Sequence, residues 1–191
     1  MSGEPRKERA DAARNRRAIL DATAALFAEH GAAGVTMERV AAAAGVGKGT
    51  IFHRFGSRAG LLQELVGERA FALREAVVHG PPPLGPGAPA AERLLAYFDA
   101  MTELALDNLD LVVAYQTLPE HPEREKLHAF WAAHITGLLR EARPELDAET
   151  TAALLMAPLG SEMVVRARQT VGRERIRQSM RDLVSSVLAP R

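Results

Sequence analysis

The chain has 191 residues, of which 47% are hydrophobic and 25% charged, which is enough to bury a core in one or two compact units. It has no cysteine, which excludes disulfides, thiolate metal sites and cysteine nucleophiles. No apolar run approaches the roughly 20 residues that cross a bilayer, and the charged first residues do not resemble a secretory signal. We therefore expect a cytoplasmic protein with no membrane partner.

The net charge of zero hides an uneven distribution along the sequence. Residues 1–60 contain ten Lys and Arg against six Asp and Glu, whereas residues 61–191 contain 14 basic and 18 acidic residues. A basic N-terminal part on an acidic body favours a polyanionic partner for that part alone, although an ordinary uneven surface would give the same counts.

Apolar residues recur at helical spacing from one end of the chain to the other, and no stretch shows the sustained alternation of a strand. The first helix is predicted to start near Asp11, after a disordered arm over residues 1–10, and to end at Gly31 and Gly34. A long helix is predicted to begin at residue 58. The Pro/Gly-rich segment 80–89 interrupts the pattern, and we expect it to join two helices that pack together. The sequence predicts an all-α protein.

Later helices are placed by prolines and by apolar stripes. Pro122 can open a helix that Pro144 must close, and the clearest stripe runs from Ile176 to Leu188. Pro158 predicts a kink in a helix over residues 148–168.

Residues 36–62 predict a helix-turn-helix. Thr36 is a good N-cap for a short helix that ends at Gly45, a residue that tolerates the left-handed cap. A second short helix, Lys48–Phe55, follows after a short turn, and its Ile51 and Phe55 share an inner face. Its opposite face is polar and cationic and has the size that a DNA major groove accepts. That face carries Lys48, Thr50, His53 and Arg54.

These residues together resemble the signature of the TetR family of regulators. The resemblance covers about 45 residues and rests on Thr36, Val40-Ala41, Ala44-Gly45-Val46, Gly49-Thr50-Ile51-Phe52, Phe55, Ser57-Arg58 and Leu61, with Leu26-Phe27 and Gly31 before them. It implies a three-helix helix-turn-helix DNA-binding domain over residues 1–57, joined by a long helix to an all-α ligand-binding and dimerisation domain over residues 58–191. It also implies a repressor that binds a palindromic double-stranded DNA operator as a homodimer and is released by a small-molecule effector.

The resemblance further implies which residues contact DNA. The set is Thr36, Lys48, Gly49, Thr50, Phe52, His53, Arg54 and Arg58. Two positions depart from the family pattern: Gly47 replaces a common serine and removes a helix cap, and Phe52 replaces a more usual tyrosine and its hydroxyl. From the chemistry of the side chains, we expect Arg54 to read a base and Lys48 to hold a phosphate.

The effector and the dimer interface are predicted in the second part of the chain. Apolar helix faces there carry candidate ligand-binding residues, which are Tyr97, Phe98, Met101, Trp131, His134 and Met163. Such stripes are also what an ordinary core contains. The resemblance implies a dimer interface through roughly 148–168 and 173–188.

Other functions find less support in the sequence. The string 45-GVGKGT-50 suggests a phosphate-binding loop, but no strand precedes it and position 42 is alanine where that motif needs glycine. His121, Glu125 and His128 could share a helix face and hold a metal, although Pro122 places His121 at the helix boundary. We expect no catalytic residue, metal or cofactor; an all-α interaction module without a DNA role stays the alternative.

Overall fold

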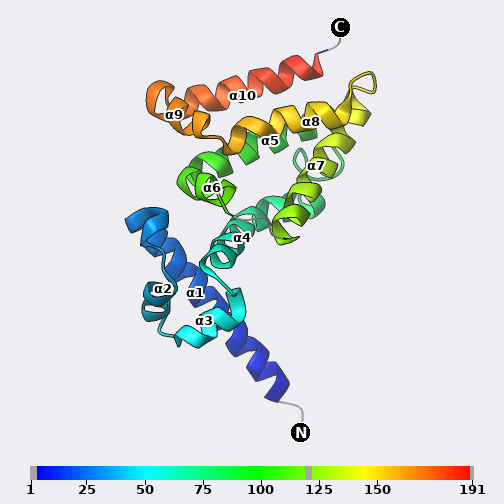
Figure 1. Cartoon of the computed structure of the whole chain (residues 1–191). Coiled ribbons are helices and arrows are strands. Elements are labelled where there is room, and N and C mark those ends of the chain that lie inside the picture. Colours follow the sequence, from blue (N-terminus) through cyan, green and yellow to red (C-terminus); the bar gives the residue numbers. More distant parts are fainter. Residues whose placement is uncertain (1–3, 119–121, 190–191) are drawn as a thin grey trace. The chain divides into compact units, whose positions relative to one another are not determined.

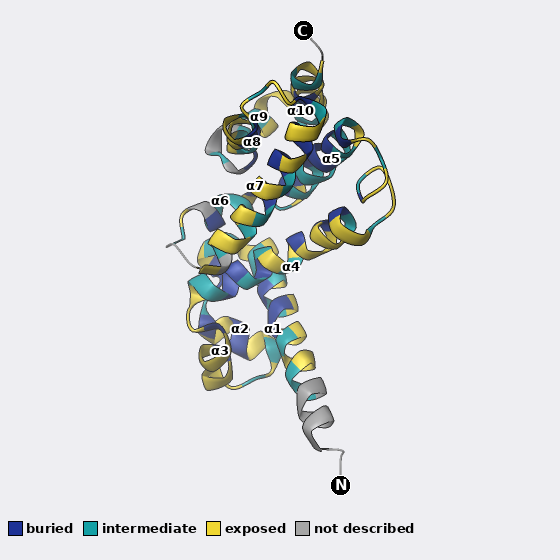
Figure 2. Ribbon diagram, turned by 90° about the vertical axis from the view of Figure 1, so that its right-hand side faces the viewer, coloured by how far each residue is buried: buried dark blue, intermediate teal, exposed yellow. Residues whose placement is uncertain are grey.

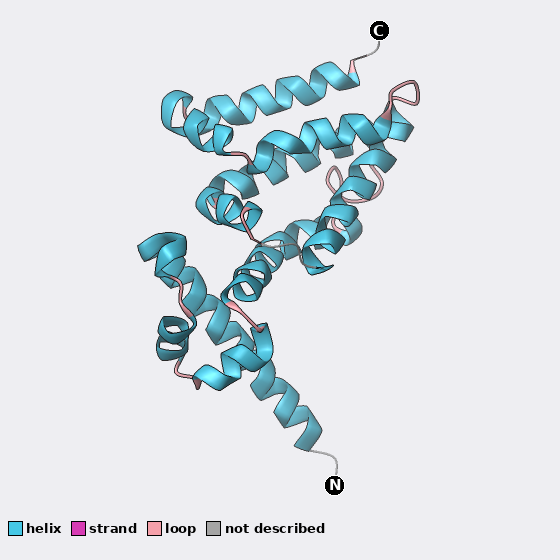
Figure 3. Ribbon diagram, in the orientation of Figure 1, coloured by secondary structure: helices cyan, strands magenta, loops and turns pink. Residues whose placement is uncertain are grey.

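The computed structural model describes residues 4–118 and 122–189, and within these ranges the chain forms helices and loops only (Figure 3). This confirms the all-α prediction. In chain order the elements are α1 (Glu4–Gly34), α2 (Met37–Ala44), α3 (Lys48–Phe55), α4 (Arg58–His79), α5 (Ala90–Asp107), α6 (Leu109–Gln116), α7 (Pro122–Ala142), α8 (Ala148–Met156), the 3-10 turn η1 (Ala157–Gly160), α9 (Glu162–Val171) and α10 (Arg173–Leu188).

The helices form two compact units, and the division falls inside α4, between Val66 and Gly67 (Figure 1). The first unit carries the helix-turn-helix and the second is the helical C-terminal part. The predicted domain boundary lies between residues 57 and 58 and refers to parts that fold independently. This boundary stays a prediction.

The core of the first unit is built by α1, α2, α3 and the first half of α4. The side chains of Ile19, Val40 and Ile51, one from each of the first three helices, are fully buried, and Leu61 and Leu65 of α4 join them (Figure 2). The short helices α2 and α3 bury too little apolar surface to be stable alone. The start of α4 therefore completes the core that holds them.

Helix α1 begins earlier than the sequence predicted. The structure has the backbone of residues 4–10 in the helix, where we expected a disordered arm; residues 1–3 lie outside the described residues. Pro5 stands in the first turn, where a proline is tolerated, and the following Arg, Lys, Glu and Ala residues are good helix formers. Gly31, with φ 65° and ψ −171°, breaks the helical geometry near the predicted end.

The core of the second unit centres on α5. Its Leu94, Tyr97 and Phe98 are buried against α7, α8, α10 and the second half of α4, including Val77. The segment 80–89 therefore connects two helices that share one core, as the sequence predicted.

The segment predicted as one kinked helix over 148–168 is two helices. The structure ends α8 at Met156, continues with η1 and starts α9 only at Glu162. Pro158 lacks the N–H of a helical hydrogen bond, and Ser161 has an extended backbone with ψ 151°. The proline thus ends the helix here instead of bending it.

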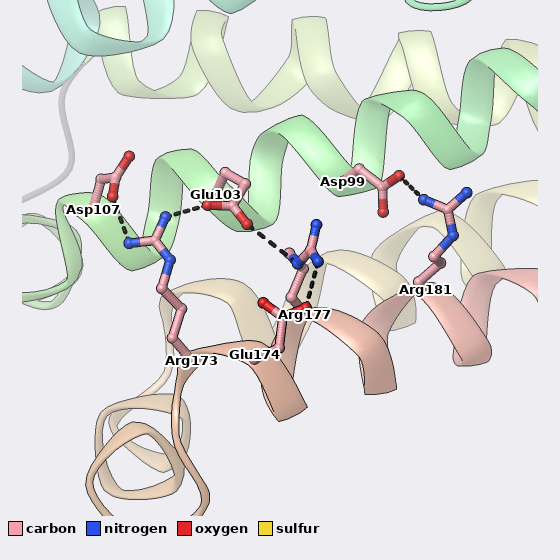
Figure 4. Close-up of polar contacts among 7 residues, drawn as sticks. All are labelled: Asp99, Glu103, Asp107, Arg173, Glu174, Arg177 and Arg181. Carbon is pink, nitrogen blue, oxygen red and sulfur yellow. Dashed lines mark hydrogen bonds and ion pairs between the residues drawn. The ribbon is translucent and has the colours of Figure 1, made fainter.

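Helix α10 lies along α5, and arginines and carboxylates join the two helices (Figure 4). Arg173 binds Glu103 and Asp107, Arg177 binds Glu103 at 3.5 Å, and Arg181 binds Asp99. We call this set the arginine ladder. The two helices are antiparallel, since the later arginine pairs with the earlier acid.

The end of α10 is held by one buried cation. Arg143, which follows α7, is almost fully buried and donates to the carbonyl oxygens of Val187 and Ala189. It also pairs with Glu145 at 2.6 Å. Carbonyls at a helix C-terminus have no partner within the helix, so the guanidinium satisfies two of them.

Among the described helices, none combines the length and the apolar character needed to cross a membrane.

Candidate nucleic-acid interface and effector site

The helix-turn-helix follows from a few capping residues. The Thr36 hydroxyl accepts a hydrogen bond from the Arg39 N–H at 3.2 Å and caps α2. Gly45 ends α2 with φ 65° and ψ 30°, the left-handed conformation that glycine adopts without strain. The Ser57 hydroxyl accepts from the Gly60 N–H at 3.1 Å and caps α4. The caps at Thr36 and Gly45 are those that the sequence predicted.

Helix α3 is amphipathic on a small scale. Ile51 and Phe55 are buried on its inner face. Gly47 stands at its N-cap and makes no side-chain cap bond, as expected from the missing serine. Packing of the inner face must therefore hold α3 in place.

The outer face of α3 is exposed. The structure exposes Lys48, Gly49, Thr50, Phe52, His53 and Arg54. Thr36, at the start of α2, is half-buried, and Arg58, at the start of α4, is exposed. Each of these residues belongs to the first unit, and five side chains of α3 are exposed on the face that would meet a flat or grooved partner.

Lys48 is engaged on this face. Its ammonium group forms an ion pair with Glu38 of α2 and lies 5.6 Å from the centre of the Phe52 ring. The hydrogen bond from Lys48 lowers the pKa of Glu38. Glu38 was not among the predicted site residues. Glu38 and Lys48 lie on different helices, and nothing in the sequence indicates that their side chains meet.

The two predicted arginines bind backbone carbonyls of their own unit. Arg54 donates to the Ala12 carbonyl of α1. Arg58 donates through Nε to the Val35 carbonyl at 2.8 Å and through Nη2 to that of Ala32. Arg58 thereby closes the turn between α1 and α2. Some hydrogen-bond donors of each guanidinium are therefore used within the protein. The sequence did not indicate this, because Ala12 is 42 residues from Arg54, and Val35 and Ala32 are 23 and 26 residues from Arg58.

In the second unit, four of the predicted ligand-binding residues form one aromatic cluster. The Tyr97 ring centre lies 5.2 Å from that of Phe98, 5.4 Å from Trp131 and 5.3 Å from His134. Phe130, which the sequence analysis did not assign to the site, stacks on His134 at 6.4 Å. Met101 is half-buried against the same core. The side chain of Met163 lies outside the described residues.

This cluster contains polar atoms without a partner. The Tyr97 hydroxyl, His134 Nε2 and Arg93 Nε are buried and make no hydrogen bond among the described residues. Burial raises the pKa of Tyr97, and burial followed by the charge of Arg93 lowers the pKa of His134. At pH 7 Tyr97 is therefore a neutral hydroxyl and His134 a neutral ring. Arg93 was not among the predicted site residues; its position one turn before Tyr97, on the same helix face, was the available signal.

Comparison with known proteins identifies the first unit. Residues 19–65 match the family model described as "Bacterial regulatory proteins, tetR family", and this range contains α2, α3 and their caps. The helix-turn-helix part of the chain, residues 19–65, is therefore that of a TetR-family regulator. The resemblance read from Thr36 to Leu61 is thus confirmed.

Individual relatives agree with this match of the helix-turn-helix part. The HTH-type transcriptional repressor AcnR of Corynebacterium glutamicum is 40% identical over 63 residues, which are 33% of this chain and 34% of that protein. The match therefore spans about a third of the relative's own length. A Rhodococcus sp. protein assigned to the TetR family of transcriptional regulators has a TM-score of 0.69 at 22% identity, over 93% of this chain and 100% of that one. The regulator FadR from Bacillus subtilis in complex with stearoyl-CoA has a TM-score of 0.63 at 20% identity, over 88% and 96%. These two likenesses show the fold.

TetR-family members are transcriptional regulators and not enzymes. Within the described residues, no group of three or more His, Asp or Glu side chains could hold a metal ion. The metal hypothesis on His121, Glu125 and His128 falls partly on His121, which lies outside the described residues.

Proposed function

We propose that this TetR-family regulator is a repressor that binds a palindromic operator as a homodimer and releases it when a small-molecule effector binds. The observation that carries the proposal is α3, whose inner face is buried at Ile51 and Phe55 while its outer face exposes a continuous set of polar and cationic side chains. A helix with this division fits the recognition helix of a helix-turn-helix.

The side chains suggest distinct roles on DNA. Lys48 can position a phosphate once it leaves Glu38, and the fork of Arg54 can read guanine with the donors that Ala12 does not occupy. Thr50 and His53 add further hydrogen-bond donors on the same face, and Gly49 lets the backbone approach closely. Thr36 and Arg58, at the starts of α2 and α4, are placed to contact the backbone of the duplex. For Phe52 we propose an apolar contact, since it has no hydroxyl.

A homodimer is supported by exposed apolar side chains on the helices that the family uses for assembly. Leu154 of α8 is 68% exposed and Leu183 of α10 is 46% exposed. Val171, the last residue of α9, is exposed as well. A second copy of the same surface would cover them. Two recognition helices could then reach half-sites about 34–36 Å apart.

Release by an effector requires that the effector bind the DNA-free conformation more tightly than the DNA-bound one. A ligand with equal affinity for both shifts nothing. We place the effector at the aromatic cluster around Tyr97. The helix α4, which contributes Leu61 to one core and Val77 to the other, is the element that would transmit the change.

Selection of bound fragments from a pool of random duplexes tests this function. The full-length protein should enrich one palindromic sequence, and binding to it should weaken steeply as salt concentration rises. Enrichment of a single half-site would contradict the dimeric reading. Absence of duplex binding at low salt would overturn the proposed function.

A further inference from the structure

The buried polar atoms at the aromatic cluster indicate what kind of ligand fits there. We propose that Arg93, Tyr97 and His134 bind the carboxylate of a small monocarboxylic acid whose remaining part is apolar. The inference rests on the proposed function, because it names the chemical class of the effector. It is drawn from residues of the second unit alone.

The three polar atoms belong to neighbouring side chains. Arg93 and Tyr97 are four residues apart on α5 and so lie one above the other on the same helix face. His134 comes from α7, and its ring centre is 5.3 Å from that of Tyr97. Arg93 is close enough to His134 for its charge to lower the pKa of that histidine. Two helices thus bring the three side chains that carry these donors next to one another.

Each atom can donate a hydrogen bond, so the group they would share is an acceptor. The Tyr97 hydroxyl and the Arg93 Nε–H are donors, and neutral His134 donates when Nε2 carries the proton. Leaving a buried donor without a partner is unfavourable, and the more so for a charged group. Among the described residues Arg93 forms no ion pair; its one recorded hydrogen bond is to the Val77 carbonyl at 3.5 Å. An anion would supply the missing charge.

A carboxylate fits these donors better than the other common ligand groups. Its two oxygens accept several hydrogen bonds, and the bonds are strengthened by the opposite charge of Arg93. An amine would be repelled by that charge. An amide has a single acceptor oxygen and no charge.

The surrounding side chains determine the rest of the ligand. Phe98 and Trp131 flank Tyr97, and Phe130 stacks on His134. Aromatic rings favour an apolar or aromatic body over a sugar or a polyanion. Thr102 also has an unpaired hydroxyl oxygen, but it is five residues after Tyr97 and therefore on another side of α5.

Trp131 is the only tryptophan in the chain and lies within the cluster, so its fluorescence reports binding directly. We would titrate the full-length protein with benzoate, phenylacetate and octanoate, each beside its amide, and with benzylamine. At least one acid should change the fluorescence with an affinity roughly tenfold or more above its amide, a factor that corresponds to about 1.4 kcal/mol. Benzylamine should not bind.

Substitutions test the named residues. Tyr97→Phe removes one hydroxyl and keeps the ring, and Arg93→Gln removes the charge; each should lower the affinity for the acid and leave that for the amide nearly unchanged. Tyr115→Phe is the matched control, since Tyr115 is the other tyrosine, is also buried and belongs to the same unit. Circular dichroism checks that every variant folds.

Equal binding of acid and amide, or no binding of any acid at millimolar concentration, would overturn the inference. So would unchanged acid affinity in both Tyr97→Phe and Arg93→Gln. Operator binding is measured on the same samples. A protein that binds DNA but no acid refutes the carboxylate site alone, whereas one that binds an acid but no DNA refutes the proposed function.

Discussion

Arg54 and Lys48 share the exposed face of α3, yet different groups hold them in the DNA-free chain. Lys48 is paired with a carboxylate, which phosphate can replace, and Arg54 is anchored to a carbonyl of α1. The anchor limits the conformations of the guanidinium, so less freedom is lost when it meets a base. A residue held in this way suits specific recognition better than a mobile cation does.

The substitutions Arg54→Ala and Lys48→Ala should therefore have different effects on DNA binding. Arg54→Ala should reduce discrimination at one position of each half-site by about 1–3 kcal/mol. Lys48→Ala should weaken binding to all duplexes alike and reduce the slope of log K against log salt concentration by about 1. Binding measured on single-base operator variants at several salt concentrations separates the two effects. Unchanged specificity in Arg54→Ala would refute base reading.

His134 makes the second unit sensitive to acid. The pKa of His134 is lowered below its ordinary 6.5, mainly by burial and then by Arg93, and burial also lowers the pKa of His128. The unfolded chain therefore takes up these protons at a higher pH than the folded one. The free energy of unfolding should be at its full value above about pH 6.5 and should decrease as the pH falls below it.

Denaturant unfolding at pH 7.5 and pH 5.5 checks this prediction. His134→Gln should lose less stability than the parent between the two pH values, because it has one fewer proton to take up. The same loss in both proteins would contradict the role given to His134.

At the scale of helices, glycine has opposite effects at two places. Gly45 ends α2 with a positive φ of 65°, whereas Gly67 stands inside α4 and has nothing within 4 Å of where a Cβ would be. Gly45→Ala should destabilise the chain by about 1–2 kcal/mol because alanine is strained in this conformation. Gly67→Ala should stabilise it by up to about 1 kcal/mol because alanine is the better helix former. Denaturant unfolding measures both, and each serves as the control for the other.

The arginine ladder can be tested on its end pair. Asp99 and Arg181 are partly exposed, so a double-mutant cycle with Asp99→Asn and Arg181→Gln should give a coupling energy of about 0.5 kcal/mol that decreases with added salt. A coupling energy that salt does not change would show that the two side chains act through packing rather than charge.

The helices and their caps were largely predictable because their signals are local. Thr36, Gly45 and Ser57 act within four residues of themselves, and Pro122 starts α7 where the sequence placed it. The early start of α1 was missed because a charged segment can be either a solvated helix or a disordered arm. At Pro158 the sequence indicated a disturbance but could not tell a bend from an end.

The candidate site was predictable only in part. The exposed face of α3 follows from the helical period, and so does the aromatic face around Tyr97. What each polar group binds does not follow. Arg54 with Ala12, Arg58 with Val35 and Lys48 with Glu38 are tertiary contacts, and helical spacing gives no information on them.

At the scale of the whole molecule, assembly should depend on the apolar surface of α8 and α10. Leu183→Glu introduces a charge that would have to be buried in the dimer, which is costly, so the variant should be a monomer and should lose cooperative binding to the palindrome. Phe71→Glu is the matched control, because Phe71 of α4 is 60% exposed and lies outside the predicted interface. Light scattering at micromolar concentration reports the mass. A dimeric Leu183→Glu variant would place the interface elsewhere.

The equal spacing of charges in the arginine ladder has a consequence for the position of α10. Arginines 173, 177 and 181 and acids 99, 103 and 107 each repeat every four residues, so sliding α10 by one turn, about 5.4 Å, would keep most arginines opposite an acid. The charges therefore only weakly select the register. The register must come from the buried Met180 and Val184 and from Arg143 at the end of the helix. An axial displacement of α10 would thus be opposed by packing and by one guanidinium, while the ladder would re-pair at little cost.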